Sequence, residues 1–379
     1  MQDIKVIFDP IGTDLWDNQV FNYEIALTAD ALALYLLAED LRKLGYKVMT
    51  ADVFLKSGDF GGYNLLITEA ETKYTRLLLS HGCIPSICYC AESPLVIPQY
   101  YKNLLAKAGI FKHSYLFRGA NISFLSENNS KHTFYWTNAK NSINTDIPWE
   151  RRKFLTLINS NKYSTKPISV KKISDIKTWI KIVLKYILNW KSFQTFPGNI
   201  PDLYKIRIKA LLHFCRNDKF DLYGLGWNKN IMGVSETEQQ MIRNSYRGEL
   251  PRGNAYKHEI LKNYQYGLCF ENTIFPGYVT EKIFDCILCG TIPIYLGAPD
   301  INEYVPQDVF INFNKFQSFK DLDYYLSNLS IDESEKYRIA AYDFVYSQSF
   351  EKFCLTGWIN DIMLSIKDVI HESLNKMKE

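Results

Sequence analysis

The chain has 379 residues, 47% of them apolar and 22% charged, which is enough to bury two ordinary cores and excludes a disordered protein. Its eight cysteines are too few for a disulfide scaffold and favour a reducing compartment. No basic stretch followed by an apolar run precedes the first predicted strand, and the uncharged, largely apolar stretch at residues 286–299 is too short to cross a bilayer. We therefore expect a cytoplasmic protein without a signal anchor.

The net charge of +3 conceals one strongly basic segment. Residues 151–191 hold 11 Lys and Arg against a single Asp, a net charge of +10, whereas residues 1–150 sum to −3. So local an excess argues against a nucleic-acid groove spread over a domain, and it indicates one contact with an anionic partner.

Short apolar runs alternate with helical patterns along most of the chain, which is typical of parallel, doubly wound α/β sheets. A loop rich in Asp, Asn and Trp follows the first strand. The pattern restarts near residue 154, and we predict two Rossmann-like domains facing a cleft, at 1–150 and 151–350, followed by a C-terminal helical segment at 351–379. The predicted strands are 4–8, 64–68, 84–90, 154–158, 220–226 (ending in a turn), 266–270 and 291–296, and the predicted helices are 29–44, 73–81, 98–108, 203–215 and 281–289.

A basic amphipathic helix is predicted at 171–191, inserted in the second domain. Its apolar residues fall on one face at helical spacing, lysines occupy the rest, and tryptophans stand at 179 and 190. This composition is typical of a helix that lies in a membrane surface. It also fits a helix packed on its own protein with its lysines solvated, so peripheral membrane contact is one of two hypotheses.

The most informative stretch is residues 264–299. A buried strand ends in Glu271 and Asn272, a Pro-Gly loop follows, and a helix begins with Thr280 as its expected N-cap. The positive end of a helix at the carboxyl end of a strand is where α/β folds hold phosphate groups. Lys282 in the first helical turn makes sense if an anion is bound there, and Glu281 could accept hydrogen bonds from ribose hydroxyls. The alternative is a solvated Glu–Lys pair at a helix start.

This stretch closely resembles the donor-binding motif of the family 10 glycosyltransferases, the α-1,3/4-fucosyltransferases. The succession Phe-Glu-Asn and then Gly-Tyr-Val-Thr-Glu-Lys-Ile carries the resemblance. Residues 90–94 (Cys-Ala-Glu-Ser-Pro) look like the Glu-Ser-Pro element of the family's acceptor half. Residues 220–226 (Phe-Asp-Leu-Tyr-Gly-Leu-Gly) resemble the strand and glycine turn that open its nucleotide site. The strong match covers residues 220–300.

The resemblance implies a GT-B fold, with an acceptor half first and a GDP-fucose half second. By motif position it implies that Asn272, Tyr278, Glu281 and Lys282 contact the donor. Arg207, on the helix before the glycine turn, would match the family's diphosphate-binding arginine. For Arg207 the competing interpretation is an ordinary arginine on an exposed helix face.

The chemistry of glycosyl transfer asks for these residue types. Departure of GDP builds negative charge on a diphosphate, which Arg207, Lys282 and a helix N-terminus can stabilise without a metal. Inversion at the sugar carbon needs a carboxylate on the opposite side to take the proton of the attacking hydroxyl. Glu92, after the strand at 84–90, is the candidate, and its alternative role is a cap at a helix N-terminus.

We expect no metal site and no required cofactor, with stimulation by Mn or Mg left open. His81, Cys83, Cys88 and Cys90 suit buried side chains better than a zinc set, and the Cys-x-x-Cys at 286–289 lies inside a predicted helix.

The resemblance thus predicts a bacterial, inverting fucosyltransferase that moves L-fucose from GDP-β-L-fucose to a Gal- or GlcNAc-containing oligosaccharide or glycolipid, in lipopolysaccharide or surface-polysaccharide synthesis. It would act in the cytoplasm or on the inner face of the cytoplasmic membrane. Two alternatives stand beside it: the same machinery with another GDP-sugar, and a non-catalytic subunit that binds a nucleotide sugar or a glycan. No nucleic-acid partner is expected.

Overall fold

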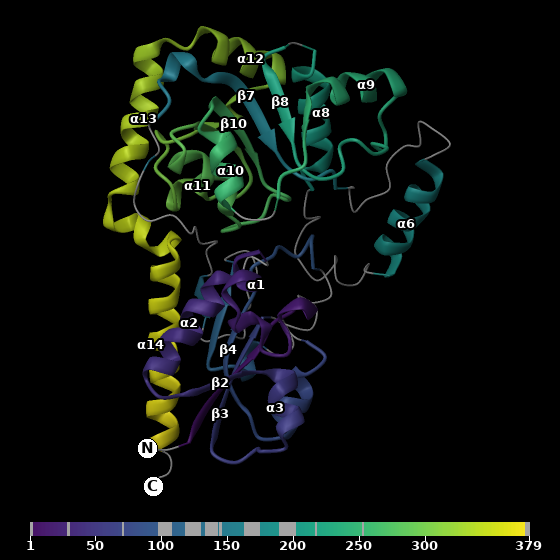
Figure 1. Cartoon of the computed structure of the whole chain (residues 1–379). Helices are drawn as coiled ribbons and strands as arrows, with labels where there is room; N and C mark the ends of the chain where they lie inside the picture. The colour runs from purple at the N-terminus through teal and green to yellow at the C-terminus, as the bar shows by residue number, and fades with distance from the viewer. Residues whose placement is uncertain are drawn as a thin grey trace. The chain divides into compact units, whose positions relative to one another are not determined.

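The computed structural model describes residues 3–28, 31–69, 72–97, 108–117, 130–132, 143, 146–162, 175–188, 202–216, 218–251 and 254–375 (Figure 1). The chain divides into two compact units. Unit 1 comprises Met1–Trp136 and Lys352–Glu379, and unit 2 comprises Thr137–Glu351. Each is described by itself below.

Unit 1 is built on a six-stranded parallel sheet in the order β2-β1-β3-β4-β5-β6. From β1 the chain moves to one side with β2 and then returns to the other side with β3, so the direction of winding reverses between β1 and β3. The strands are β1 (Ile4–Asp9), β2 (Lys47–Thr50), β3 (Tyr63–Glu69), β4 (Ile84–Tyr89), β5 (His113–Leu116) and β6 (Ser130–His132).

One face of this sheet is covered by two helices from opposite ends of the chain. Alternate strand residues such as Val6, Phe8 and Leu65 pack in one core with α2 and α14, as the two-residue period of a strand requires. The helices of unit 1 are α1 (Tyr23–Thr28), α2 (Leu32–Lys43), α3 (Ala51–Ser57), α4 (Thr75–Ser80) and α14 (Leu355–Asn375).

The C-terminal residues are part of unit 1 rather than a separate segment. Tyr115 on β5 donates to the backbone oxygen of Asp361 at 3.0 Å, and its hydroxyl lies 2.8 Å from Ser365. The first predicted boundary also moves, from residue 150 to 136. Trp149 is buried in the core of unit 2, and Gln265 donates to its backbone oxygen at 3.1 Å, which ties the segment before β7 to the second sheet.

Unit 2 holds the second parallel sheet, in the order β12-β11-β10-β7-β8-β9. The chain starts at β7, adds β8 and β9 on one side, and then places β10 to β12 on the other. The winding therefore reverses between β7 and β10. The strands are β7 (Lys153–Ile158), β8 (Phe220–Tyr223), β9 (Tyr246–Gly248), β10 (Tyr264–Phe270), β11 (Ile292–Leu296) and β12 (Ile311–Asn312).

Helices cover both faces of the unit 2 sheet. Leu268 and Phe270 point into a core shared with α8, α9 and α12, whereas Cys269 points to the opposite face, where its sulfur lies 3.3 Å from that of Cys286 on α11. The sheet is doubly wound, as predicted. The helices are α6 (Asp175–Leu188), α8 (Tyr204–Phe214), α9 (Glu236–Ser245), α10 (Asn254–Leu261), α11 (Glu281–Leu288), α12 (Phe319–Asn328) and α13 (Ile331–Val345).

Several connecting segments contain short 3₁₀ helices, two of which lie in the predicted loop after β1. They are η1 (Thr13–Leu15), η2 (Gln19–Phe21), η3 (Ala108–Ile110), η5 (Trp149–Arg151), η6 (Ile301–Glu303), η7 (Phe313–Lys315) and η8 (Gln348–Phe353). The predicted helix at 98–108 falls almost entirely outside the described residues. Within the described ranges, no helix combines the length and apolarity needed to cross a bilayer.

Candidate functional site

The winding of the unit 2 sheet predicts where a ligand binds. In open α/β sheets, ligands bind beyond the carboxyl ends of the strands at the point where the winding reverses. That point lies here between β7, which is followed by Asn159, and β10, which is followed by Glu271 and Asn272.

Arg207 bridges these two strand ends. It lies on α8 and is only 2% exposed. Its guanidinium donates to the side-chain oxygen of Asn159 at 3.0 Å and to that of Asn272 at 3.1 Å, and to the backbone oxygen of Phe270 at 2.5 Å. The alternative of an ordinary arginine on an exposed helix face is therefore wrong.

Burial leaves this guanidinium short of partners. The Nε atom of Arg207 has no hydrogen-bond partner among the described residues. Burial lowers the pKa of Arg207, and the nearby groups that oppose this effect include Tyr204 and Glu271. A buried cation with an unused donor is a ready contact for an anion.

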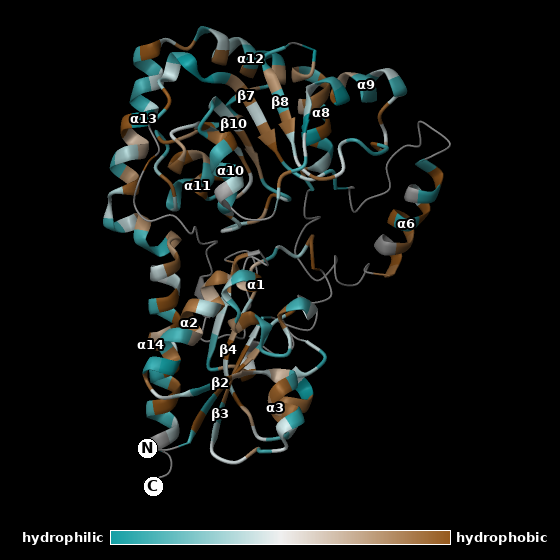
Figure 2. Ribbon diagram, viewed as in Figure 1, coloured by the Kyte–Doolittle hydropathy of each residue, from teal (hydrophilic) through white to brown (hydrophobic). Residues whose placement is uncertain are grey.

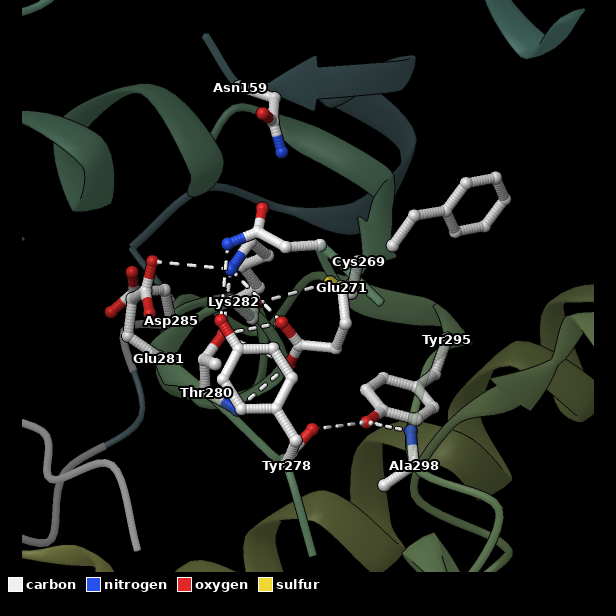
Figure 3. Close-up of polar contacts among 12 residues, drawn as sticks. Asn159, Cys269, Glu271, Tyr278, Thr280, Glu281, Lys282, Asp285, Tyr295 and Ala298 are labelled. Carbon is white, nitrogen blue, oxygen red and sulfur yellow. Dashed lines mark hydrogen bonds and ion pairs between the residues drawn. The ribbon is translucent and has the colours of Figure 1, made fainter. Parts of the chain in front are cut away.

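Glu271 organises the start of α11 (Figure 3). This fully buried carboxylate accepts hydrogen bonds from the backbone N–H of Thr280 at 2.8 Å and from its hydroxyl at 2.9 and 2.8 Å. It also accepts one from the ammonium of Lys282 at 3.0 Å. Thr280 is the N-cap residue by position, as predicted, but its side chain makes no capping hydrogen bond to the helix, because the hydroxyl turns to Glu271.

Glu281 and Lys282 form an ion pair that is mostly removed from water. Their charged atoms are 3.6 Å apart, and the two side chains are 17% and 16% exposed. Although burial opposes its ionisation, Lys282 and Lys257 hold the pKa of Glu281 down to about 2. Burial likewise opposes the charge of Lys282, and Glu271 and Glu281 outweigh it, so the pKa of Lys282 is raised. The alternative of a solvated pair at a helix start is therefore wrong.

Tyr278 completes the group. It is 1% exposed, and its hydroxyl accepts a hydrogen bond from the side-chain amide of Asn272 at 3.1 Å. Asn272 thus lies between Tyr278 and Arg207. The structure brings together all five residues that the sequence placed at the donor site, namely Arg207, Asn272, Tyr278, Glu281 and Lys282. Their contact with a donor stays a prediction.

Three members of this group were not assigned from the sequence. Glu271 was noted only as a polar strand end, and Asn159 and Lys257 were not singled out. Asn159 could have been found, because it directly follows the predicted strand at 154–158 in the same way that Glu271 follows its own. Lys257 carries no local signal, since it reaches Glu281, at 3.7 Å, from a separate helix.

The glycine turn after β8 supports Asn159. Gly224 has φ +122°, and a Cβ at this position would lie 2.2 Å from the backbone oxygen of Asn159. Only glycine allows this approach of the two backbones. The turn at 224–226 therefore positions the residue that accepts the hydrogen bond from Arg207.

The candidate base Glu92 lies in unit 1, three residues after the end of β4, and its side chain is partly exposed. Glu69 ends the neighbouring strand β3. Burial raises the pKa of Glu69 to about 7, a hydrogen bond from the backbone N–H of Ile11 opposes this, and the charge of Glu92 adds to it. Glu69 is the last residue of β3, where the winding of this sheet reverses, and it was not assigned from the sequence. Its environment depends on tertiary packing, which the sequence pattern does not carry.

No group of His, Cys, Asp and Glu is arranged to hold a metal ion in the parts of the chain that the structure describes. The eight cysteines are all buried, and none of them is joined in a disulfide.

Comparison with known proteins agrees with the sequence motifs. Residues 219–354 match the sequence model described as "Glycosyltransferase family 10 (fucosyltransferase) C-term". The α-(1,3)-fucosyltransferase FucT of Helicobacter pylori is 42% identical over 81 residues, which cover 21% of this chain and 17% of that protein. The human 3-galactosyl-N-acetylglucosaminide 4-α-L-fucosyltransferase FUT3 is 38% identical over 88 residues, 22% of this chain and 24% of that protein. The alignments thus span about a fifth of these relatives.

Solved structures match over nearly the whole chain, at low identity. A crystal structure of an α1,3-fucosyltransferase has a TM-score of 0.52 and 15% identity, covering 97% of this chain and 90% of that one. Anabaena Alr3699/HepE in complex with UDP has a TM-score of 0.54 and 11% identity, covering 96% and 100%. These structures bear on the fold alone. The predicted GT-B fold class is confirmed, and so is the family resemblance, over residues 219–354.

Proposed function

Because residues 219–354 carry the sequence of the family 10 glycosyltransferase (fucosyltransferase) C-terminal region, we propose that the protein is an inverting α-1,3/4-fucosyltransferase. It moves L-fucose from GDP-β-L-fucose to a hydroxyl of a Gal- or GlcNAc-containing acceptor. The observation that carries the proposal is the gathering of Arg207, Asn272, Tyr278, Glu281 and Lys282 where the winding of the unit 2 sheet reverses.

Two cations in this group suit a leaving diphosphate. An ammonium has three N–H bonds, and Lys282 donates to Glu271 and to the hydroxyl of Thr280, which leaves capacity for a phosphate oxygen. Arg207 retains an unused N–H at Nε. Charge that grows on GDP as the sugar departs is stabilised by preorganised donors of this kind, without reorganisation of solvent.

The carboxylate of Glu281 suits the neutral part of the donor. Its pKa is lowered to about 2, so it is ionised at neutral pH. It is then an acceptor only and can bind sugar hydroxyls. Tyr278 and Asn272 offer a hydroxyl and an amide for the same purpose.

Glu92 acts as the general base of the proposed reaction. The acceptor oxygen attacks C1 of fucose and loses its proton to Glu92, while the bond from C1 to the diphosphate oxygen breaks and GDP leaves with the electron pair. The sugar passes through an oxocarbenium-like state and its configuration inverts. No step requires a metal, and stimulation by Mn or Mg is tested by comparing rates with each ion and with EDTA.

The acceptor is proposed to be a lipid-linked or surface-polysaccharide precursor of a bacterial cell, and the site of action the cytoplasm or the inner face of its membrane. A relative is named as a fucosyltransferase that acts on a galactosyl-N-acetylglucosaminide, and the basic segment at 151–191 suits an anionic surface.

The decisive experiment measures GDP release by the full chain with GDP-fucose and a panel of lactose and N-acetyllactosamine acceptors. Acceptor-dependent release is expected. GDP binding without release would point to another GDP-sugar or to a non-catalytic subunit, and absence of GDP binding would overturn the donor site.

Glu92→Gln tests the base in the same assay. We expect turnover to fall by about 10²- to 10⁴-fold, the usual contribution of a positioned base, with GDP affinity unchanged. Glu39→Gln, the same substitution on the solvent side of α2, is the matched control. A Glu92→Gln enzyme that keeps most of its turnover would eliminate the assignment.

A further inference from the structure

Helix α6 leaves most of its apolar side chains in water. Six of them are between 36% and 80% exposed, an unusual number for a helix of 14 residues. Figure 2 shows the hydrophobic colour along this helix, beside hydrophilic residues. The exposed residues are Ile176, Trp179, Ile180, Leu184, Ile187 and Leu188.

Five of these side chains, all except Leu188, form one continuous surface. At 100° per residue, the positions from Trp179 to Leu184 around the helix axis span an arc of about 140° that also contains Ile176, Ile180 and Ile187. We call these five residues the apolar arc of α6. Lys177 and Lys181 follow directly beyond its Leu184 edge, at about 20° and 60° from Leu184. The helix therefore has a wide apolar side that positive charge borders along one edge.

A different side of α6 holds it to its own protein. Asp175 is fully buried, and its carboxylate accepts hydrogen bonds from the side chain of Asn230 at 2.9 Å and from the backbone N–H of Gly233 at 3.4 Å. Ile182 is also buried, at 7% exposed. Both lie outside the apolar arc on the helical wheel. Packing on the protein thus accounts for the burial of Asp175 and Ile182, but it does not account for the exposed side chains of the apolar arc.

The charge of the sequence that contains α6 indicates what covers the arc. Residues 151–191 carry a net charge of +10, while the rest of the chain is negative. An apolar strip bordered by lysines, with a tryptophan at one edge, matches the boundary between the acyl chains and the anionic headgroups of a bilayer. A second copy of this chain would place like charges face to face at such a contact, which disfavours a dimer.

We propose that α6 is a membrane-docking helix, which lies flat on an anionic bilayer with its apolar arc among the upper acyl chains and Lys177 and Lys181 at the phosphates. The helix is far too short to span the bilayer, so the contact is peripheral and reversible. The inference does not depend on the reaction proposed above.

Flotation of the full chain with vesicles of phosphatidylcholine, and of phosphatidylcholine mixed with phosphatidylglycerol, tests the proposal. We expect the protein to float with the mixed vesicles, to remain behind with the neutral ones, and to release as salt is raised. Protein that stays behind with both kinds of vesicle overturns the proposal.

Paired substitutions separate the two parts of the surface. Leu184→Ser with Ile187→Ser should lower the partition coefficient at least tenfold, whereas Lys177→Gln with Lys181→Gln should remove the preference for anionic vesicles. The matched control is Leu364→Ser with Ile339→Ser, which changes two equally exposed aliphatic residues on α14 and α13 and should float like the wild type.

Two further measurements complete the test. Thermal unfolding of each variant shows whether it is folded, and GDP binding by the Leu184→Ser, Ile187→Ser protein should equal that of the wild type. Sedimentation of the wild type without lipid should show a single copy. Self-association that disappears in the apolar variant would assign the arc to a protein interface and overturn the membrane proposal.

Discussion

Glu69 offers the sharpest test of the electrostatics at the carboxyl edge of the unit 1 sheet. It ends β3, and its pKa is raised from 4.5 to about 7, mainly by burial and partly by the charge of Glu92. The perturbation is Glu69→Gln, which removes the charge and keeps an oxygen that can accept the hydrogen bond from the N–H of Ile11.

The size and sign of the effect follow from the two pKa values. Between pH 4.5 and 7 the folded protein binds more protons at Glu69 than the unfolded chain does, so the free energy of unfolding decreases as pH rises through this window. Each pKa unit corresponds to 1.36 kcal/mol, which makes the full cost about 3 kcal/mol above pH 7. Solvent screening reduces this value, because the side chain is only partly buried.

Thermal unfolding between pH 5 and pH 8 measures this pH dependence of the unfolding free energy. At about 2–4 °C for each kcal/mol in a unit of this size, the melting temperature of Glu69→Gln should rise relative to wild type by up to about 10 °C at pH 8, and the two should converge toward pH 5. Glu69→Ala is the control. It lacks the acceptor for the N–H of Ile11, so its melting temperature should be lower than that of Glu69→Gln at each pH, yet with the same pH dependence as Glu69→Gln. A difference between wild type and Glu69→Gln that is constant across the window would refute the reasoning.

Three more predictions concern unit 2. Lys282→Met leaves Glu271 buried without its cation, and we expect a loss of about 3–5 kcal/mol of unfolding free energy. Adding Glu271→Gln should restore the melting temperature but not GDP binding, and a double variant that binds GDP normally would contradict the donor role of Lys282. Gly224→Ala should lower the melting temperature far more than Gly248→Ala, because both glycines have φ above +120° but only the first has a backbone oxygen within 2.2 Å of the new Cβ; equal effects would show that φ alone matters. Arg207→Lys keeps the positive charge but loses the planar guanidinium with its several N–H donors, so calorimetric titration should show GDP affinity about 10- to 100-fold weaker. Unchanged affinity would remove Arg207 from the site.

Most of the inner strands could be predicted, although β5 was not, and the edge strands could not. Buried parallel strands read as continuous apolar runs, and the runs at 4–8, 64–68 and 266–270 each lie within a strand of the structure. β9 and β12 have three and two residues, too few to show any period. Their pairing is decided by the neighbouring strand rather than by their own side chains.

The site was predictable where its members are close in sequence. Asn272 to Lys282 form one motif, whereas the partners of Arg207 lie 48 and 65 residues away along the chain. Only the family resemblance pointed to Arg207. Its burial and its bridge between Asn159 and Asn272 follow from the winding of the sheet, which no local pattern contains.

The division of charge in unit 2 assigns different tasks to the two cations. Lys282 already has two carboxylate neighbours, Glu271 at 3.0 Å and Glu281 at 3.6 Å, so its charge is compensated before any ligand arrives. No carboxylate lies within ion-pair distance of Arg207 among the described residues; its hydrogen bonds go to neutral oxygens. An incoming diphosphate would therefore gain most from Arg207, the cation that lacks a counter-ion. Lys282, held by its own carboxylates, would keep the start of α11 in place whether or not a nucleotide is bound.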